Sequence, residues 1–99
     1  MTRIERIERY EAMLDRTSLA ARQLEEALDA FEGVQRELKA LERYYTGAQW
    51  KADYDADCRG RLPATLKRGV LSEDGIDHLL ERCRELRERC GALERRTKP

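Results

Sequence analysis

The sequence predicts an all-α protein in which a long N-terminal helix and a C-terminal helix form an antiparallel, coiled-coil-like hairpin joined by one or two short helices. Three observations support this fold class. Apolar and charged residues each make up 40% of the 99 residues, a balance typical of long amphipathic helices. Only two prolines are present to interrupt helices. Apolar residues also recur at spacings of three and four over both long segments, within one domain spanning residues 1–99.

The first segment predicts a single helix over residues 2–44. Its stripe of mostly apolar side chains keeps helical spacing and comprises Ile4, Ile7, Tyr10, Leu14, Thr17, Ala21, Leu24, Leu28, Phe31, Val34, Leu38, Leu41 and Tyr45. Heptad spacing holds from Ile7 to Phe31, and steps of three then lead through Val34, so we expect a bend or a change of packing partner beside Gly33. At about 1.5 Å per residue, this helix would be roughly 60 Å long, more than a 99-residue chain can enclose.

Residues 45–71 predict an elbow that reverses the chain. Thr46 and Gln49 fit a capping box, which predicts a short helix from about Gly47 to Cys58, with Gly60 ending it. Four of the six aromatic side chains fall in or beside this segment, namely Tyr44, Tyr45, Trp50 and Tyr54. Such side chains fill the end of a helical hairpin but are also enriched at binding surfaces, so these four form the candidate interaction surface.

The remainder of the elbow, LPATLKRGVL, concentrates turn residues. Pro63 predicts the first turn of a brief helix through Lys67, and Gly69 predicts its left-handed stop. Val70 and Leu71 would then fill the core.

A final helix is predicted over residues 73–95. Ser72 is its expected N-cap, and Glu73 and Asp74 are favourably placed in its first turn. Its apolar stripe comprises Ile76, Leu79, Leu80, Cys83, Leu86, Cys90 and Leu93.

Lys67 and Arg68 allow two interpretations. Next to the N-terminus of the last helix, this basic pair could contact an anion. Alternatively, one of the two cations reaches back to Asp53 or Asp57 and clamps the short helices together. We favour the structural interpretation.

No metal, cofactor or catalytic site is predicted. Asp53, Asp55 and Asp57 resemble the opening of a calcium loop, but Cys58 stands where its glycine should be and Ala64 where its glutamate should be. There is one histidine and no nucleophile or phosphate-loop motif, so we expect no enzymatic activity.

The three cysteines do not suggest a disulfide framework or a zinc site. Cys58, Cys83 and Cys90 are odd in number and not closely paired, so reduced thiols are expected. Cys83 and Cys90 lie two helical turns apart, roughly 10 Å, and His78 is displaced around the helix, so these groups cannot converge on one ion. No apolar run approaches the roughly 18 residues of a membrane span, and no signal peptide is evident, so a cytoplasmic location is expected.

The segments YYTGAQWKADYDAD and LPATLKRGVLSEDGIDHLLE resemble the centre of a family of small helical proteins, domain of unknown function 4298. The resemblance covers nearly the whole chain and is specific from Tyr44 to Glu81. It implies a bacterial, cytosolic helical protein, and it transfers no catalytic residue.

Two functions are compatible with the sequence. The first is a non-enzymatic helical protein-interaction module, which acts as an adaptor, assembly or regulatory protein. Since two helices bury only one seam, we expect a homodimer whose four long helices bury more.

The alternative is a nucleic-acid or nucleotide-associated protein that uses the basic elbow. Residues 44–71 carry five basic and three acidic side chains, a net charge of +2. Their basic residues include Arg59, Arg61, Lys67 and Arg68. The whole chain is neutral, with 20 basic and 20 acidic residues, and so has no global field that attracts nucleic acid or anionic lipid.

Overall fold

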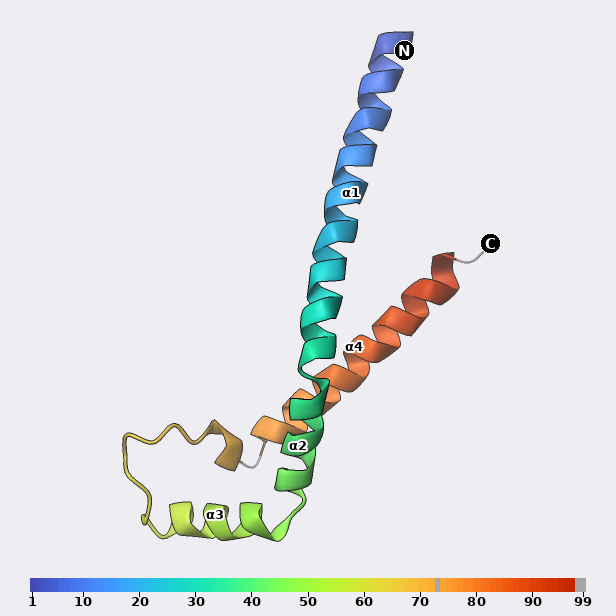
Figure 1. Ribbon diagram of the computed structural model, residues 1–99. Coiled ribbons are helices and arrows are strands. Elements are labelled where there is room, and N and C mark those ends of the chain that lie inside the picture. The colour runs from blue at the N-terminus through green and yellow to red at the C-terminus, as the bar shows by residue number, and fades with distance from the viewer. Residues whose placement is uncertain (73, 98–99) are drawn as a thin grey trace. The chain divides into compact units, whose positions relative to one another are not determined.

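The computed structural model describes residues 1–72 and 74–97, and these residues form helices but no strand (Figure 1). The predicted all-α class is therefore confirmed. The elements in chain order are α1 (Arg3–Gly33), α2 (Gln35–Tyr45), α3 (Ala48–Cys58), the 3-10 helix η1 (Gly69–Leu71) and α4 (Gly75–Thr97). The chain divides into two compact units, unit 1 with residues 1–36 and unit 2 with residues 37–99. The single domain predicted over the whole chain stays a prediction.

Unit 1 consists almost entirely of helix α1. Its N-cap is Thr2, whose Oγ1 accepts a hydrogen bond from the backbone N–H of Glu5 at 3.1 Å. At the other end, the Val34 N–H donates to the Phe31 carbonyl at 3.3 Å, which is one residue short of its α-helical partner. The Gln35 side chain donates to the same carbonyl at 2.9 Å. Together these two bonds end the helix.

The single helix predicted over residues 2–44 is therefore wrong in one respect. It is divided at Val34 into α1 and α2, because the Gln35 side chain bonds the carbonyl that its own backbone N–H would bond in a continuous helix. The interruption lies beside Gly33, where the change in stripe spacing predicts an irregularity.

Helix α1 has no buried residue. Its isoleucines and leucines are all exposed, from Ile4 to Leu28, whereas Met13 and Phe31 are half-buried. Unit 1 contains no second element on which this face could pack.

In unit 2, the turn between α2 and α3 differs from the prediction. The Thr46 hydroxyl donates to the Glu42 carbonyl at 2.9 Å and so serves the end of α2. The N-cap of α3 is Gly47, which provides no side-chain hydrogen bond. The predicted capping box of Thr46 with Gln49 is wrong, because the N-cap position belongs to Gly47, which has no side chain to accept the capping bond.

The end of α3 agrees with the prediction. Gly60 has a φ of 70°, the left-handed conformation that glycine adopts at little cost. The Gly60 N–H donates to Asp57 O and the Arg61 N–H donates to Ala56 O, each at 3.0 Å. This pair of bonds is a Schellman motif, so Gly60 ends the helix as expected.

The brief helix predicted from Pro63 to Lys67 does not form. A single turn is present instead, in which the Leu66 N–H donates to the Pro63 carbonyl at 3.1 Å. The Arg68 guanidinium donates to the same carbonyl at 2.8 Å and thereby occupies the acceptor that a continuing helix would use. Gly69 begins η1 and is not in the left-handed region, so its predicted role as a helix stop is also wrong.

The core of unit 2 lies where η1 contacts α3 and α4. Among the described residues, the buried hydrophobic side chains are Leu71, Ile76 and Cys83, each no more than 6% exposed. Val70 is 43% exposed, so the prediction that Val70 and Leu71 fill the core holds for Leu71 alone.

Ser72 caps α4, as predicted. Its Oγ accepts a hydrogen bond from the Gly75 N–H at 3.0 Å and donates to the Gly69 carbonyl at 2.9 Å. A Cβ atom on Gly75 would lie 2.5 Å from this Oγ and 2.8 Å from the Gly69 oxygen, so the close approach requires glycine. Glu73, the predicted first residue of the helix, lies outside the described residues, and α4 continues to Thr97.

Candidate functional site

The predicted aromatic residues of the elbow do come together in unit 2. Trp50 stacks on Tyr54, with ring centroids 5.0 Å apart and planes 13° apart. Tyr45 meets the same indole edge to face, at 5.1 Å and 80°. The indole N–H of Trp50 donates to the Val70 carbonyl at 2.8 Å. The indole therefore joins α3 to η1, and its only donor is used inside the protein.

Two tyrosine hydroxyls extend this network to other elements. The Tyr44 hydroxyl donates to an Asp53 carboxylate oxygen at 2.6 Å, and the Tyr45 hydroxyl donates to Asp77 at 2.9 Å. The first bond joins α2 to α3, and the second joins α2 to α4. The hydrogen bond that Tyr44 donates to Asp53 raises the pKa of Tyr44 to about 12, and burial and the negative charge of Asp53 add to this effect.

Lys67 and Arg68 differ in their contacts. Arg68 forms an ion pair with Asp57, as the structural interpretation predicts, and also donates to the Pro63 carbonyl. The other predicted acceptor, Asp53, bonds Tyr44 instead. Arg68 therefore clamps the end of α3 to the segment before η1. Lys67 has no hydrogen bond or ion pair within the described part of the chain and is exposed.

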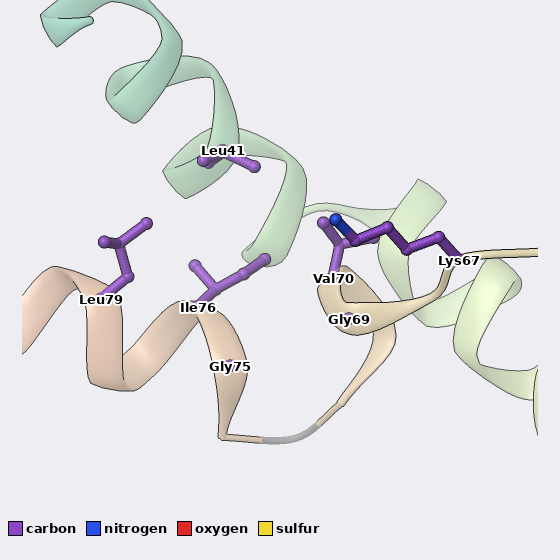
Figure 2. Close-up of a pocket in the computed structure, with 7 residues that line it drawn as sticks. All are labelled: Leu41, Lys67, Gly69, Val70, Gly75, Ile76 and Leu79. Atoms are coloured by element: carbon purple, nitrogen blue, oxygen red, sulfur yellow. The ribbon is translucent and has the colours of Figure 1, made fainter.

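A hollow of about 350 Å³ lies beside Lys67, between α2, η1 and the start of α4 (Figure 2). Its walls are mainly apolar, and the Lys67 side chain extends alongside Val70 at one edge. The residues that line it are Leu41, Lys67, Val70, Ile76 and Leu79, together with two glycines. Such a surface suits the packing of an apolar side chain, with one amine available at its edge.

The three aspartates of the calcium-like motif have three different partners. Asp55 pairs with Arg59 at 3.0 Å, whereas Asp53 and Asp57 bond Tyr44 and Arg68. Within residues 1–72 and 74–97, no group of three His, Cys, Asp or Glu side chains is arranged to hold a metal ion.

All three cysteines are free thiols in different environments. Cys83 is buried in the core of unit 2, whereas Cys58 and Cys90 are exposed. Of the two cysteines in the predicted apolar stripe of the last helix, Cys83 is therefore a core residue and Cys90 is not.

Two contacts of this site were not predicted from the sequence. Tyr45 and Asp77 are 32 positions apart, and Trp50 and Val70 are 20 apart. No local pattern indicates such a pair, because each bond depends on how the elements are arranged. A buried tyrosine or tryptophan does need a polar partner, and this need is the only signal that the sequence offers.

The fold and this network define a small all-α protein that lacks a membrane helix in its described residues, since no helix there is long and apolar enough to span a bilayer. The chain belongs to the family described as "Domain of unknown function (DUF4298)", whose sequence profile matches residues 7–91. The family resemblance of the elbow is thereby confirmed. No curated protein and no solved structure matches the chain.

Proposed function

We propose that this protein is a non-enzymatic helical interaction module that associates through α1 and acts as an adaptor, assembly or regulatory protein. The observation that supports the proposal best is that α1 spans 31 residues without one buried side chain. Long amphipathic helices owe most of their stability to the packing of their apolar face. The exposed stripe includes Ile4, Ile7, Tyr10, Leu14, Leu24 and Leu28.

The first partner in this proposal is a second copy of the chain. In the proposed dimer, α4 runs antiparallel along α1 as a coiled-coil-like hairpin, and two hairpins form a four-helix bundle. Exposed leucines on α4 support this arrangement, because they give that helix an apolar line of its own. The proposal places the dimer in the bacterial cytoplasm, where free thiols such as the three cysteines here are the rule.

The aromatic cluster has a supporting part in this proposal. Its rings contact one another and the Trp50 N–H is used by Val70, which favours a role in holding unit 2 together. Binding of a further protein at the half-buried rings stays a prediction. The residues concerned are Tyr44, Tyr45, Trp50 and Tyr54.

Charge substitutions in the stripe test the proposal. We expect the chain to be dimeric and the Leu14→Glu, Leu28→Glu double variant to be monomeric, because a charge cannot be buried unpaired in a helix seam. Leu19→Glu is the matched control, since Leu19 is also exposed but lies about 140° around the helix from Leu14. Analytical ultracentrifugation gives the masses, and circular dichroism verifies that α1 is retained. The same mass for all three proteins would count against association through the stripe.

The alternative, nucleic-acid or nucleotide binding at the elbow, has less support. Arg59 pairs with Asp55 and Arg68 with Asp57, so two of its four cations are already neutralised. Fluorescence anisotropy with duplex DNA, single-stranded DNA and RNA at low salt tests this function. Affinity that falls steeply with added salt would support it, and the absence of binding to all three would exclude it.

A further inference from the structure

Helix α4 carries an exposed apolar line beside the residues that it buries in unit 2, and the first leucine of this line, Leu79, also lines the hollow. Leu79, Leu86 and Leu93 are 40%, 38% and 51% exposed, whereas Ile76 and Cys83 are buried. Since seven residues make nearly two full turns, the three leucines lie along one side of the helix.

A row of arginines borders this leucine line. Each arginine follows a leucine by three positions and therefore lies about 60° around the helix, on the side away from Ile76 and Cys83. All three arginines are exposed, and none forms an ion pair with another described residue. We call this row the basic edge, and it consists of Arg82, Arg89 and Arg96.

The apolar stripe of α1 has a border of the opposite charge. Glutamates follow Ile7, Ala21 and Leu28 by four positions and lie about 40° around the helix from them. They too are exposed and have no ion pair in the described residues. We call this row the acidic edge, and it consists of Glu11, Glu25 and Glu32. The opposite border of the stripe is uncharged over its central part, where it consists of Met13, Ala20 and Ala27.

We propose that the stripe of α1 packs against α4 of a second copy, in parallel orientation, with the acidic edge of one chain facing the basic edge of the other. This pairing rests on the proposed self-association and replaces the hairpin packing within one chain, because each α1 stripe then packs on α4 of the second copy and not on α4 of its own chain. By two-fold symmetry, the dimer contains the same seam twice. Both seams join an apolar line to an apolar stripe and neutralise two rows of charges that have no ion pair within the described chain.

The positions of the charges determine the orientation. If Ile7, Ala21 and Leu28 are a positions of α1, the glutamates of the acidic edge are e positions. If the three leucines are d positions of α4, the arginines of the basic edge are g positions. Parallel helices bring e positions of one helix next to g positions of the other. Antiparallel packing would bring g positions together and would place the arginines against Met13, Ala20 and Ala27. An antiparallel seam between two α1 helices would bring the acidic edges together, which repel each other.

Reversal of the charges on one edge at a time tests the pairing. Variant A carries Glu11→Arg, Glu25→Arg and Glu32→Arg, and variant B carries Arg82→Glu, Arg89→Glu and Arg96→Glu. Each variant alone brings like charges together in both seams, so we expect its dimer dissociation constant to rise at least about tenfold. In an equimolar mixture of A and B, every seam again joins opposite charges. We expect a heterodimer with nearly native affinity, measured by sedimentation velocity with one variant labelled.

A third variant controls for the net charge of the mixture. Variant C reverses three acids on the outer face of α1, through Glu8→Arg, Asp15→Arg and Glu26→Arg, and has the same net charge as variant A. Mixed with B, it restores only one of the two seams. The A and B mixture should therefore bind more tightly than the C and B mixture. Equal affinities would show general charge attraction and overturn the pairing.

The remaining outcomes separate the pairing from the self-association on which it rests. If the native chain dimerises but A and B dimerise equally well, the pairing is wrong and another seam forms the dimer. If A and B are both weakened and their mixture does not recover, the two edges meet within one chain, and the pairing between copies is again overturned. A monomeric native chain would overturn both the self-association and the pairing.

Discussion

The two units of this chain obtain their stability in different ways. Unit 2 joins short elements through buried side chains and hydrogen bonds between residues far apart in sequence, such as Tyr45 with Asp77. Unit 1 has a capped helix with no buried residue. The contacts within unit 2 explain its conformation, whereas α1 has an apolar face that its own unit leaves unpacked. This unpacked face is the reason for the proposal that the long helix binds a partner.

The largest effect of a single substitution should come from the core of unit 2. Ile76 is 3% exposed, and Ile76→Ala should lower the free energy of unfolding by about 3 kcal/mol because it leaves a cavity. Urea denaturation followed by the fluorescence of Trp50, the single tryptophan of the sequence, measures this change.

The matched substitution in unit 1 is Leu14→Ala. Leu14 is 59% exposed, so we expect this variant to lose stability only at protein concentrations at which the chains associate. A loss as large as that of Ile76→Ala at every concentration would contradict the difference between the units.

Substitution by alanine should have different effects on stability at two glycines. Gly75→Ala places a Cβ atom 2.5 Å from Ser72 Oγ and 2.8 Å from a backbone oxygen, so we expect a loss of about 1 to 3 kcal/mol. At the end of α1, a Cβ on Gly33 would meet nothing within 4 Å. Gly33→Ala should therefore leave stability unchanged or raise it by up to about 1 kcal/mol. Thermal denaturation of both variants by circular dichroism distinguishes them, and equal losses would show that α1 is tightly packed at this position.

The smallest effect should appear at high pH. The pKa of Tyr44 is about 12 in the folded chain, above the ordinary value of 10.0 that the unfolded chain should have. The folded state therefore binds this proton more tightly, and its stabilising contribution is complete below about pH 10 and is lost as the pH rises from about 10 to 12. Spectroscopic titration of tyrosinate should show that Asp53→Asn lowers the pKa of Tyr44. An unchanged titration curve in that variant would contradict the role of the hydrogen bond.

Periodicity and cap residues were sufficient to predict much of the fold. They predicted the all-α class, the position of α3, its end at Gly60 and the cap at Ser72. They also indicated an irregularity beside Gly33. These features depend on residues close together in sequence, whose preferences act before any tertiary contact forms.

The errors have a common physical cause. Gln35, Thr46 and Arg68 each donate a side-chain hydrogen bond to a backbone carbonyl, those of Phe31, Glu42 and Pro63. In the first and third cases, the bond is made to a carbonyl that helix continuation would use, and in the second it holds Thr46 on the end of α2, so that Gly47 becomes the N-cap of α3. Such side-chain bonds to backbone carbonyls do not alter the apolar periodicity of the sequence, so periodicity cannot predict them.

The candidate site was less predictable than the fold. The clustering of the aromatic residues and the ion pair of Arg68 with Asp57 both follow from residues that lie near one another in sequence. The bonds of Tyr45 with Asp77 and of Trp50 with the Val70 carbonyl depend on elements that meet only after folding.

The most direct test of the role of α1 is the molar mass of the native chain in solution, measured by light scattering after size exclusion at micromolar concentration. Self-association through the stripe predicts the mass of two chains and a thermal midpoint that rises with protein concentration. The mass of one chain, together with a sharp thermal transition that does not depend on concentration, would contradict it.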